Sequence, residues 1–285
     1  MIYTCTLNPA VDFYVQVPEF STGRINQGEL LRFVPGGKGL NVSMVLKQLG
    51  VENIALGFVG GKFGKLLQEL LIEYNITTDF VEIKGETRLN VKIRDELETD
   101  INLVGPEVTK SEVDKLLSKL DIINPNDYLV VGGKAPKTSE SIISMIGSYA
   151  KKKDLNLIVD MSGNDLETML NYQPLLIKPN KEELETLIKR KLDNLSEIET
   201  VCKYLIYKYH ITYVLVSLGK DGAILVSKDE SIYEKAPIGK VINTVGAGDA
   251  LLAGFLASYT KSPDLKAALQ QGIKCASKVV FTGYI

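Results

Sequence analysis

The chain has 285 residues, and its 33 Lys and Arg side chains nearly balance its 35 Asp and Glu side chains, for a net charge of −2. That balance excludes the strongly basic surface that binds nucleic acid or anionic membranes. Hydrophobic residues make up 45% and charged residues 24%, as in soluble globular proteins, and no apolar run approaches the ~20 residues that cross a bilayer. The opening MIYTCTLNPAVD lacks the basic and apolar regions of a signal peptide, and it predicts a first strand instead.

The predicted elements alternate between strand and helix along the chain. Short apolar runs predict strands at 1–7, 53–60, 127–133, 155–162, 174–180, 211–219 and 222–227. Apolar residues at helical spacing predict helices at 39–50, 63–75, 139–153, 181–190, 248–260 and 264–281. Strands that alternate with helices need crossover connections. The pattern therefore predicts an α/β fold, with a doubly wound, mostly parallel sheet flanked by helices.

Two segments interrupt this alternation, 13–35 and 87–103, and both are rich in strand-forming and polar residues. The second contains RLNVKIRDELETDINLV, which predicts a hairpin with its turn near Asp95 to Glu98. We expect the two segments to form a small β-sheet lid over a site. The exposed strands of such a lid favour pairing with a second copy, which predicts a homodimer through the lid.

The kinds of residue present limit the chemistry. His210 is the only histidine, which disfavours a zinc site and any Ser-His-Asp or Cys-His mechanism. Cys5, Cys202 and Cys275 are scattered and odd in number, so we expect reduced, mostly buried thiols in a cytoplasmic protein rather than a disulfide framework. Catalysis would then use carboxylates, lysines, arginines, backbone amides or a bound cation.

The segment PGGKGLN, at 35–41, opens the first predicted helix at the edge of the sheet where open α/β folds bind ligands. Gly36 and Gly37 allow close approach of the backbone, and Lys38 and Asn41 supply polar side chains. The segment is neither a GxxxxGK[ST] phosphate loop nor a GxGxxG dinucleotide motif. A plain glycine loop before a helix is the alternative.

The segment KPNKEELE places Asn180 and Glu183 on the first turn of a helix. One interpretation is a helix cap, with Asn180 as N-cap and an acid three residues later. The other is an Asn/Glu pair that organises a hydrated Mg²⁺, since this ion keeps several waters and takes few protein ligands when phosphates supply the rest.

The segment TVGAGD, at 244–249, places an acid directly after Gly-Ala-Gly, where an apolar helix begins. One interpretation is a tight turn with Asp249 as N-cap. The other is an anion hole formed by the amides of Ala247, Gly248 and Asp249, beside a carboxylate that takes a proton from a hydroxyl. Phosphoryl transfer needs such donors, an in-line alcohol, a base and a metal, and it needs no histidine.

The ordered motifs TLNPAVD, PGGKGLNVSMVLKQLG, ALGFVGG, ETRLNVKI, IKPNKEELE, VSLGKDGAILV and NTVGAGDALLAGF resemble the ribokinase-like carbohydrate kinases, the PfkB family, over essentially the whole chain. TLNPAVD with GGKGLNVS is similar to the branch that acts on phosphorylated ketohexoses. Within it, TRLNVKI is closer to fructose-1-phosphate kinases than to tagatose-6-phosphate kinases. The resemblance implies one domain over 1–285, ATP and Mg²⁺, and phosphoryl transfer to the C6 hydroxyl of fructose 1-phosphate.

The resemblance also implies a role for individual residues. Those expected at the sugar phosphate are Asp12, Gly37, Lys38, Asn41, Arg88, Asn90 and Lys134. Those expected at the nucleotide are Lys178, Asn180, Ser217, Gly219, Gly222 and Thr244. Gly246, Ala247 and Gly248 would form the anion hole and Asp249 would be the base, while Glu183 would act on Mg²⁺ through water. Arg24, on the lid, is a further candidate for the sugar phosphate.

Three departures from the family pattern bear on the substrate. GGKAP puts Lys134 where the family has a small hydroxyl residue, so Lys134 either adds a cation for a phosphate or crowds the pocket. Asn26-Gln27 replaces an Asn-Arg pair on the lid, which removes one positive charge. FTGYI comes about a helix before the family's usual end, and this shortening predicts the loss of a wall beside the adenine. Two alternatives stay open: a tagatose-6-phosphate kinase, and a catalytically weak sugar-phosphate sensor.

Overall fold

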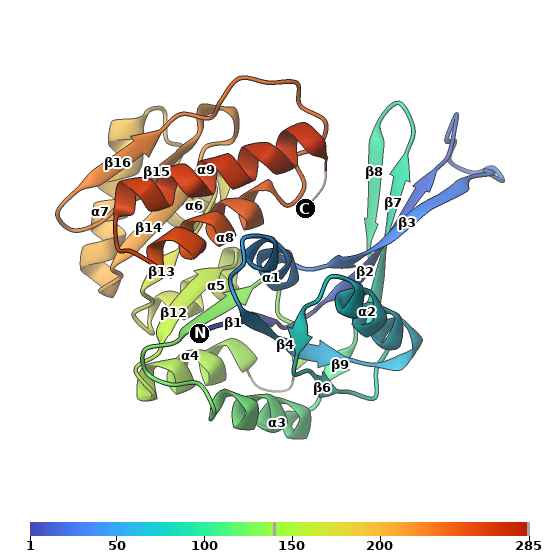
Figure 1. Ribbon diagram of the computed structural model, residues 1–285, viewed down its shortest axis with the longest axis horizontal. Coiled ribbons are helices and arrows are strands. Elements are labelled where there is room, and N and C mark those ends of the chain that lie inside the picture. The colour runs from blue at the N-terminus through green and yellow to red at the C-terminus, as the bar shows by residue number, and fades with distance from the viewer. Residues whose placement is uncertain (139–140, 284–285) are drawn as a thin grey trace.

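The computed structural model describes residues 1–138 and 141–283. A central sheet runs through the body of the molecule (Figure 1). Its strands are β1 (Ile2–Thr6), β4 (Asn53–Val59), β5 (Thr77–Thr78), β6 (Val81–Glu82), β10 (Tyr128–Gly132), β12 (Asn156–Asp160), β13 (Leu176–Ile177), β14 (Tyr213–Ser217), β15 (Ala223–Val226) and β16 (Ser231–Glu234). The order is β16-β15-β14-β13-β12-β10-β1-β4-β5, with β6 beside β4. β15 runs antiparallel to both neighbours and the other pairs are parallel, so the predicted mostly parallel α/β sheet is confirmed.

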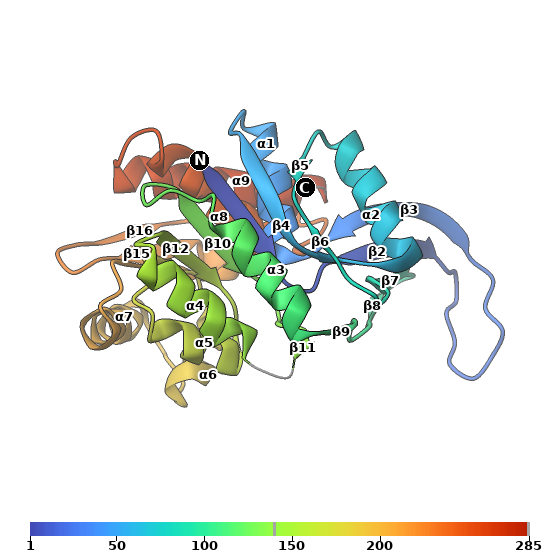
Figure 2. The ribbon, with the colours of Figure 1, turned by 90° about the horizontal axis from the view of Figure 1, so that it is seen from below.

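Helices cover both faces of this sheet (Figures 1 and 2). One face carries α1 (Lys38–Gln48), α8 (Ala247–Tyr259) and α9 (Leu265–Thr282). The other carries α3 (Lys110–Leu120), α4 (Ile142–Lys152), α5 (Gly163–Leu170), α6 (Lys181–Ile188) and α7 (Leu195–Tyr209). Strand alternation produces the two layers, since Val130 packs on the first face while Leu129 and Val131 pack on the second. Helix α8 is buried almost all round, because α1, α9 and the sheet surround it.

Three of these helices lie in segments for which we predicted no element. Helix α3 begins at the capping box of Thr109 and Glu112, a pattern that the sequence contains, and α7 begins at the N-cap Asn194. Helix α5 has only eight residues, too few to display a clear apolar period. Of the predicted helix 139–153, α4 follows the N-cap Ser141, and residues 139 and 140 lie outside the described residues.

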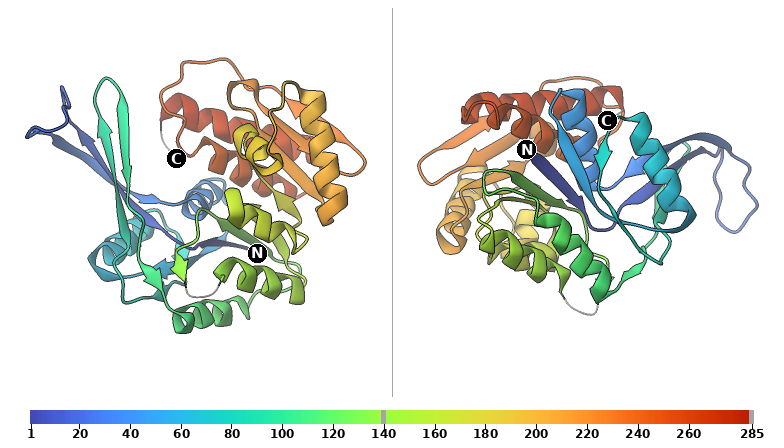
Figure 3. Two further views of the ribbon diagram at one scale, coloured as in Figure 1. Left: turned by 180° about the vertical axis from the view of Figure 1, so that it is seen from behind. Right: turned by 60° about the horizontal axis from the view of Figure 1, so that its bottom comes forward.

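A second, smaller sheet projects from the body (Figures 1 and 3). Its strands are β2 (Ala10–Gln16), β3 (Glu29–Gly36), β7 (Arg88–Arg94) and β8 (Glu98–Asn102), in the order β3-β2-β7-β8. The predicted hairpin is confirmed as β7 and β8, which pair antiparallel. Helix α2 (Gly61–Glu73) packs against β2 and β3 at the base of this sheet, and β9 (Glu107–Val108) pairs with β11 (Lys137–Thr138) nearby.

Two further expectations concern single features of the chain. The three cysteines are buried and form no disulfide, as predicted for reduced thiols. Within residues 1–138 and 141–283, no helix has both the length and the apolar character that crossing a membrane requires.

Candidate active site

A cleft of about 820 Å³ lies at the carboxyl ends of the central strands, between β14, α6, α8 and α9. The residues predicted from sequence that line it are Lys38, Lys178, Asn180, Glu183, Ser217, Gly219, Gly222, Thr244, Gly246, Ala247, Gly248 and Asp249. Parallel strands all end at this edge of the sheet, which is why segments far apart in the sequence meet here. All the positions predicted for the nucleotide, the anion hole and the metal therefore share one cavity.

The start of α8 presents backbone amides to the cleft. Gly246 is the N-cap, with a left-handed φ of 79° that favours glycine, and no side chain caps this end of the helix. The amide of Ala247 donates to Thr244 O at 3.2 Å and closes a turn. The amides of Gly248 and Asp249 form no hydrogen bond with the described part of the chain. Two of the three predicted donors are thus available to an anion, and Asp249 is not the N-cap.

The carboxyl group of Asp249 lies beside these amides, in a residue only 7% exposed. Asn41 Nδ2 donates to Asp249 Oδ2 at 2.7 Å. Burial, and then the nearby Asp160 carboxylate, raise the pKa of Asp249 to about 7, although Lys178 and the Asn41 hydrogen bond partly oppose them. A carboxyl group that titrates near neutral pH is suited to proton transfer.

Asp160, at the end of β12, holds two lysines in the cleft. Its Oδ1 accepts from Lys38 Nζ at 2.8 Å, and its Oδ2 lies 3.2 Å from Lys178 Nζ. Burial opposes the charge of Asp160, but the two lysines outweigh burial and lower its pKa. Lys178 Nζ also lies at the start of α8, 3.3 Å from where a side-chain carbon on Gly248 would sit. Two ammonium groups and two amides therefore converge next to Asp249.

Asn180 and Glu183 form the helix cap that was one of the two interpretations of KPNKEELE. Glu183 N donates to Asn180 Oδ1 at 2.7 Å, and Asn180 N donates to Glu183 Oε2 at 2.9 Å. The other oxygen, Oε1, lies 3.6 Å from Lys38 Nζ, and the residue lines the cleft. Capping therefore uses one carboxylate oxygen and leaves the other in the cavity.

An apolar wall closes the far side of the cleft. Its residues come from the loop after β16 and from α9: Ala236, Pro237, Ile238, Gly239, Val241, Ile273, Ala276, Val280 and Phe281. The Phe281 ring lies so close to Gly239 that a side-chain carbon there would come within 2.6 Å of it. The cleft thus has an apolar side suited to a flat ring, whereas we expected this wall to be lost.

A smaller cavity of about 50 Å³ adjoins the small sheet, and both Asp12 and Asn41 line it. Asn90 Nδ2 donates to Asp12 Oδ1 at 2.7 Å across β2 and β7. Burial raises the pKa of Asp12, and the Asn90 hydrogen bond partly counters it. Asn41 lines this cavity and Asp249 lines the larger cleft, so the hydrogen bond between them joins the two spaces. Three of the residues predicted for the sugar therefore lie together.

Other residues predicted for the sugar phosphate line neither cavity. Gly37 is the N-cap of α1, where a side-chain carbon would come within 2.6 Å of Thr6. Arg88 donates from Nε to Asn8 O at 3.1 Å and from Nη1 to a second main-chain carbonyl. Lys134 is exposed beyond β10, and Arg24 is exposed in the loop between β2 and β3. Lys38, predicted near the sugar phosphate, lines the larger cleft instead.

Three residues at the two cavities, Asp160, Arg32 and Tyr14, were not assigned to the site from the sequence. Asp160 gave a signal, since it is a carboxylate at a strand's carboxyl end, but no motif marked it. Arg32 and Tyr14 line the smaller cavity from β3 and β2, and no motif contains them. Their position depends on how the strands of the small sheet pair, which residue patterns alone do not give.

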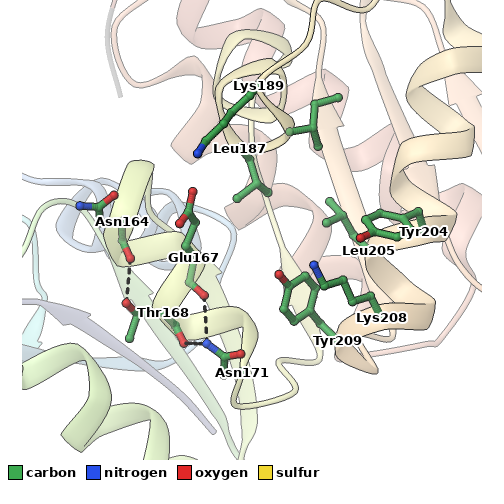
Figure 4. A pocket seen from close by; sticks show the side chains of 11 residues that line it. Asn164, Glu167, Thr168, Asn171, Leu187, Lys189, Tyr204, Leu205, Lys208 and Tyr209 are labelled. Carbon is green, nitrogen blue, oxygen red and sulfur yellow. Dashed lines mark hydrogen bonds between the residues drawn. The ribbon is translucent and has the colours of Figure 1, made fainter.

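A separate groove of about 670 Å³ lies between α5, α6 and α7, and Figure 4 shows Glu167 of α5 and Lys189, the residue that follows α6, among its lining side chains. Lys208 Nζ lies 4.9 Å from the centre of the Tyr209 ring in this groove. None of the residues predicted for the site lines it. The predicted site residues that line a cavity therefore lie in the cleft at the strand ends and in the smaller cavity beside the small sheet.

Comparison with protein families agrees with this geometry. The family model described as "pfkB family carbohydrate kinase" matches residues 5–284. The chain belongs to the pfkB family. The predicted resemblance is confirmed, and with it the ribokinase-like α/β architecture.

Individual relatives cover nearly the whole of this pfkB-family chain. The 1-phosphofructokinase of Bacillus subtilis (strain 168) is 36% identical over 283 residues, which are 99% of this chain and 93% of that protein. The D-tagatose-1-phosphate kinase of Bacillus licheniformis is also 36% identical, over 99% of this chain and 93% of that protein. The crystal structure of Escherichia coli phosphofructokinase-2 in complex with fructose-6-phosphate matches with a TM-score of 0.93 at 27% identity, over 98% of this chain and 93% of that one.

Proposed function

We propose that the protein is an ATP-dependent sugar-phosphate kinase that converts fructose 1-phosphate to fructose 1,6-bisphosphate. The observation that carries this proposal is the start of α8, where buried Asp249, with a pKa raised to about 7, lies beside two amides that have no partner in the described chain. Membership of the pfkB family and the similarity to the Bacillus subtilis 1-phosphofructokinase support it.

In the proposed reaction Asp249 is the base. The C6 hydroxyl of the sugar loses its proton to the Asp249 carboxylate while its oxygen forms a bond to the γ-phosphorus of ATP. The bond between that phosphorus and the β–γ bridging oxygen breaks, and ADP leaves with its electron pair. The Asn41 hydrogen bond holds the carboxylate in place for this transfer.

Donors around the cleft would stabilise the charge that develops on the transferred group. The amides of Gly248 and Asp249 point from the start of a helix, where the helix dipole also favours an anion. Lys38 and Lys178 are held in advance by Asp160, so they need little rearrangement when phosphates arrive. The adenine would lie against the apolar wall around Phe281.

Mg²⁺ fits this donor set as a partner of ATP rather than as a resident ion. Among the described residues, no three His, Cys, Asp or Glu side chains are grouped to hold a metal. Glu183 has one oxygen free of the helix cap, and Mg²⁺ takes few protein ligands when phosphates and waters complete its shell. Glu183, through water, would hold the ion, which neutralises phosphate charge when bound.

We propose that the small sheet is the lid and also the surface for a homodimer. Its Leu30, Leu31 and Ile101 side chains are 57%, 47% and 47% exposed, an unusual concentration on strands that also have free edges. Leu30→Asp combined with Ile101→Asp should convert a dimer to a monomer in size-exclusion chromatography with light scattering. Ile72→Asp, at an exposed position on α2, is the matched control and should leave the dimer intact.

Coupled ADP-release assays test the function. The protein is incubated with ATP, Mg²⁺ and, in parallel, fructose 1-phosphate, tagatose 6-phosphate or tagatose 1-phosphate. We expect the highest kcat/KM with fructose 1-phosphate. A higher value with tagatose 6-phosphate would favour the alternative of a tagatose-6-phosphate kinase, and a higher value with tagatose 1-phosphate would match the activity for which the Bacillus licheniformis relative is named. Sugar-phosphate binding without any turnover would instead indicate a sensor.

A further inference from the structure

The apolar side of the larger cleft contains one polar side chain, that of Ser277 on α9. The residues by which α9 lines the cleft are three or four positions apart, so they share one face of the helix: Ile273, Ala276, Ser277, Val280 and Phe281. The loop after β16 lines the cleft with Ala236, Pro237, Ile238, Gly239 and Val241. Among the described residues by which these two segments line the cleft, only Ser277 has a polar side chain.

The Ser277 hydroxyl forms no hydrogen bond with the described part of the chain. Other helical hydroxyls donate to the carbonyl four residues earlier, as Ser118 Oγ does to Asp114 O at 3.0 Å and Thr260 Oγ1 does to Leu256 O at 2.8 Å. Ser277 is only 9% exposed. Its oxygen is not among the fully enclosed polar atoms that lack a partner, so the hydroxyl reaches the surface of the cleft.

This hydroxyl does not stabilise the folded chain. A hydroxyl that is buried without a hydrogen-bond partner makes folding less favourable, and alanine at the same position would avoid that cost. Ser277 would gain a partner when a molecule in the cleft supplies one. A role in binding therefore accounts for a serine on this face of α9, whereas a role in packing does not.

The surroundings of Ser277 suit a base rather than a phosphate. The ammonium groups of Lys38 and Lys178 lie with Asp160 near the start of α8. The α9 face around Ser277 is apolar, and a phosphate placed there would lose water without gaining a charged partner. A base has apolar faces and a polar edge, such as N7 and the N6 amino group of adenine, and a serine hydroxyl can both donate and accept.

We propose that the Ser277 hydroxyl forms a hydrogen bond with the edge of the nucleotide's base and so contributes to binding of the phosphate donor. This inference rests on the proposed function, which puts a nucleotide in the cleft. Ala276 and Ser277 are small and lie between the larger Ile273 and Phe281 side chains, which leaves room for a ring beside the hydroxyl. The base does not react, so the contact would be equally strong before and during phosphoryl transfer. Its loss should raise KM for ATP without changing kcat.

The test compares Ser277→Ala with Ser258→Ala, which changes a helical serine of α8 that lines neither cavity. Binding of ADP with Mg²⁺ is measured by calorimetry, and Tm is measured without nucleotide. We expect Ser277→Ala to raise the Kd of ADP about three- to tenfold, the value of one neutral hydrogen bond, with an unchanged or higher Tm. Ser258→Ala should leave the Kd within about twofold of the wild type. In the coupled assay, Ser277→Ala should raise KM for ATP and leave KM for the sugar phosphate unchanged.

A second ligand distinguishes the base from the ribose. The same titrations are repeated with 2′,3′-dideoxyadenosine diphosphate, which has the base and the phosphates but no ribose hydroxyls. A contact with the base predicts that Ser277→Ala weakens binding of this ligand by the same factor as binding of ADP. A loss that is seen with ADP and disappears with the dideoxy ligand would assign the contact to the ribose and overturn the inference.

The remaining outcomes separate this inference from the proposed function. Binding of ADP that depends on Ser277 in a protein without turnover of any sugar phosphate would support the inference and refute the kinase. Turnover by a folded Ser277→Ala variant with an unchanged Kd of ADP would overturn the inference alone. Equal losses in the two variants, or a lower Tm in Ser277→Ala, would also overturn it, since Ser277 would then support the fold. Absence of ADP binding by the wild type would overturn it too.

Discussion

The proposed nucleotide side and the proposed acceptor side of the site are built in different ways. The cleft between α6, α8 and α9 is formed by loops and helix starts at the ends of parallel strands, and backbone groups such as the Gly248 amide contribute directly. The cavity beside the small sheet is formed by side chains such as Asp12 and Arg32, which come from neighbouring strands. The first side suits a ligand common to many kinases, and the second suits selection among sugars.

The two sides meet at the hydrogen bond between Asn41 and Asp249. Asn41 lines the acceptor cavity and donates to Asp249, which lines the nucleotide cleft. If one side binds the nucleotide and the other binds the acceptor, substitutions on either side should change KM for one substrate. Substitutions at the junction, the Asn41–Asp249 hydrogen bond, should change kcat.

The largest expected effect is at the junction. Asp249→Asn removes the proposed base and keeps an oxygen for the Asn41 hydrogen bond, so kcat should fall about 10²- to 10⁴-fold. The Kd of ATP should change little, because the amides and lysines of the cleft remain. Stopped or quenched assays give kcat, and titration calorimetry gives the Kd. Turnover within tenfold of the wild type would rule out Asp249 as the base.

The next largest effect concerns the ion pairs that Asp160 forms with the lysines of the larger cleft. Asp160→Asn leaves Lys178, which is only 4% exposed, without its buried counter-charge, and should lower the free energy of unfolding by about 3–5 kcal/mol. Urea denaturation measures this loss. The control is Glu52→Gln, which breaks the exposed pair with Lys47 and should cost at most about 1 kcal/mol. Equal losses in the two variants would mean that Asp160 does not organise the cleft.

A smaller effect is expected on the acceptor side alone. Asp12→Ala removes the carboxylate that would hold sugar hydroxyls, so KM for the sugar phosphate should rise about 10- to 100-fold with little change in KM for ATP. Asp100→Ala is the control on the same sheet, since Asp100 binds Lys92 and lines neither cavity. A parallel rise in both KM values would contradict the division between the two sides.

The smallest effect concerns pH. Asp249 must be ionised to accept a proton, and its pKa is raised to about 7, so kcat/KM should fall about tenfold for each unit below pH 7. Asn41→Ala removes a hydrogen bond that lowers this pKa, and the acid limb of the profile should move to higher pH. An acid limb that stays in place in this variant would show that another group controls the profile.

The residues of the larger cleft were easier to predict from the sequence than those of the smaller cavity. The α8 start, the Asn180–Glu183 turn and the glycines of PGGKGLN are local patterns, so their place at one edge of the sheet was predictable from strand and helix order. Arg32 and Tyr14 were not predictable, because their meeting depends on strand register in a separate sheet. The role of Asp160 depends on two lysines that are distant in sequence. Helices α3 and α7 were not predicted, although the sequence contains their N-cap residues, Thr109 and Asn194.

The short connection between β3 and α1 links the position of the small sheet to that of helix α1. Strand β3 ends at Gly36 and α1 begins at Lys38, so Gly37 alone joins the projecting sheet to the helix that carries Asn41. If a bound sugar tilts the sheet, this joint would turn and would move the first turn of α1, where Lys38 donates to Asp160. If this movement couples the two pockets, thermodynamic reciprocity requires ATP to alter the sugar's affinity by the same factor as the sugar alters that of ATP.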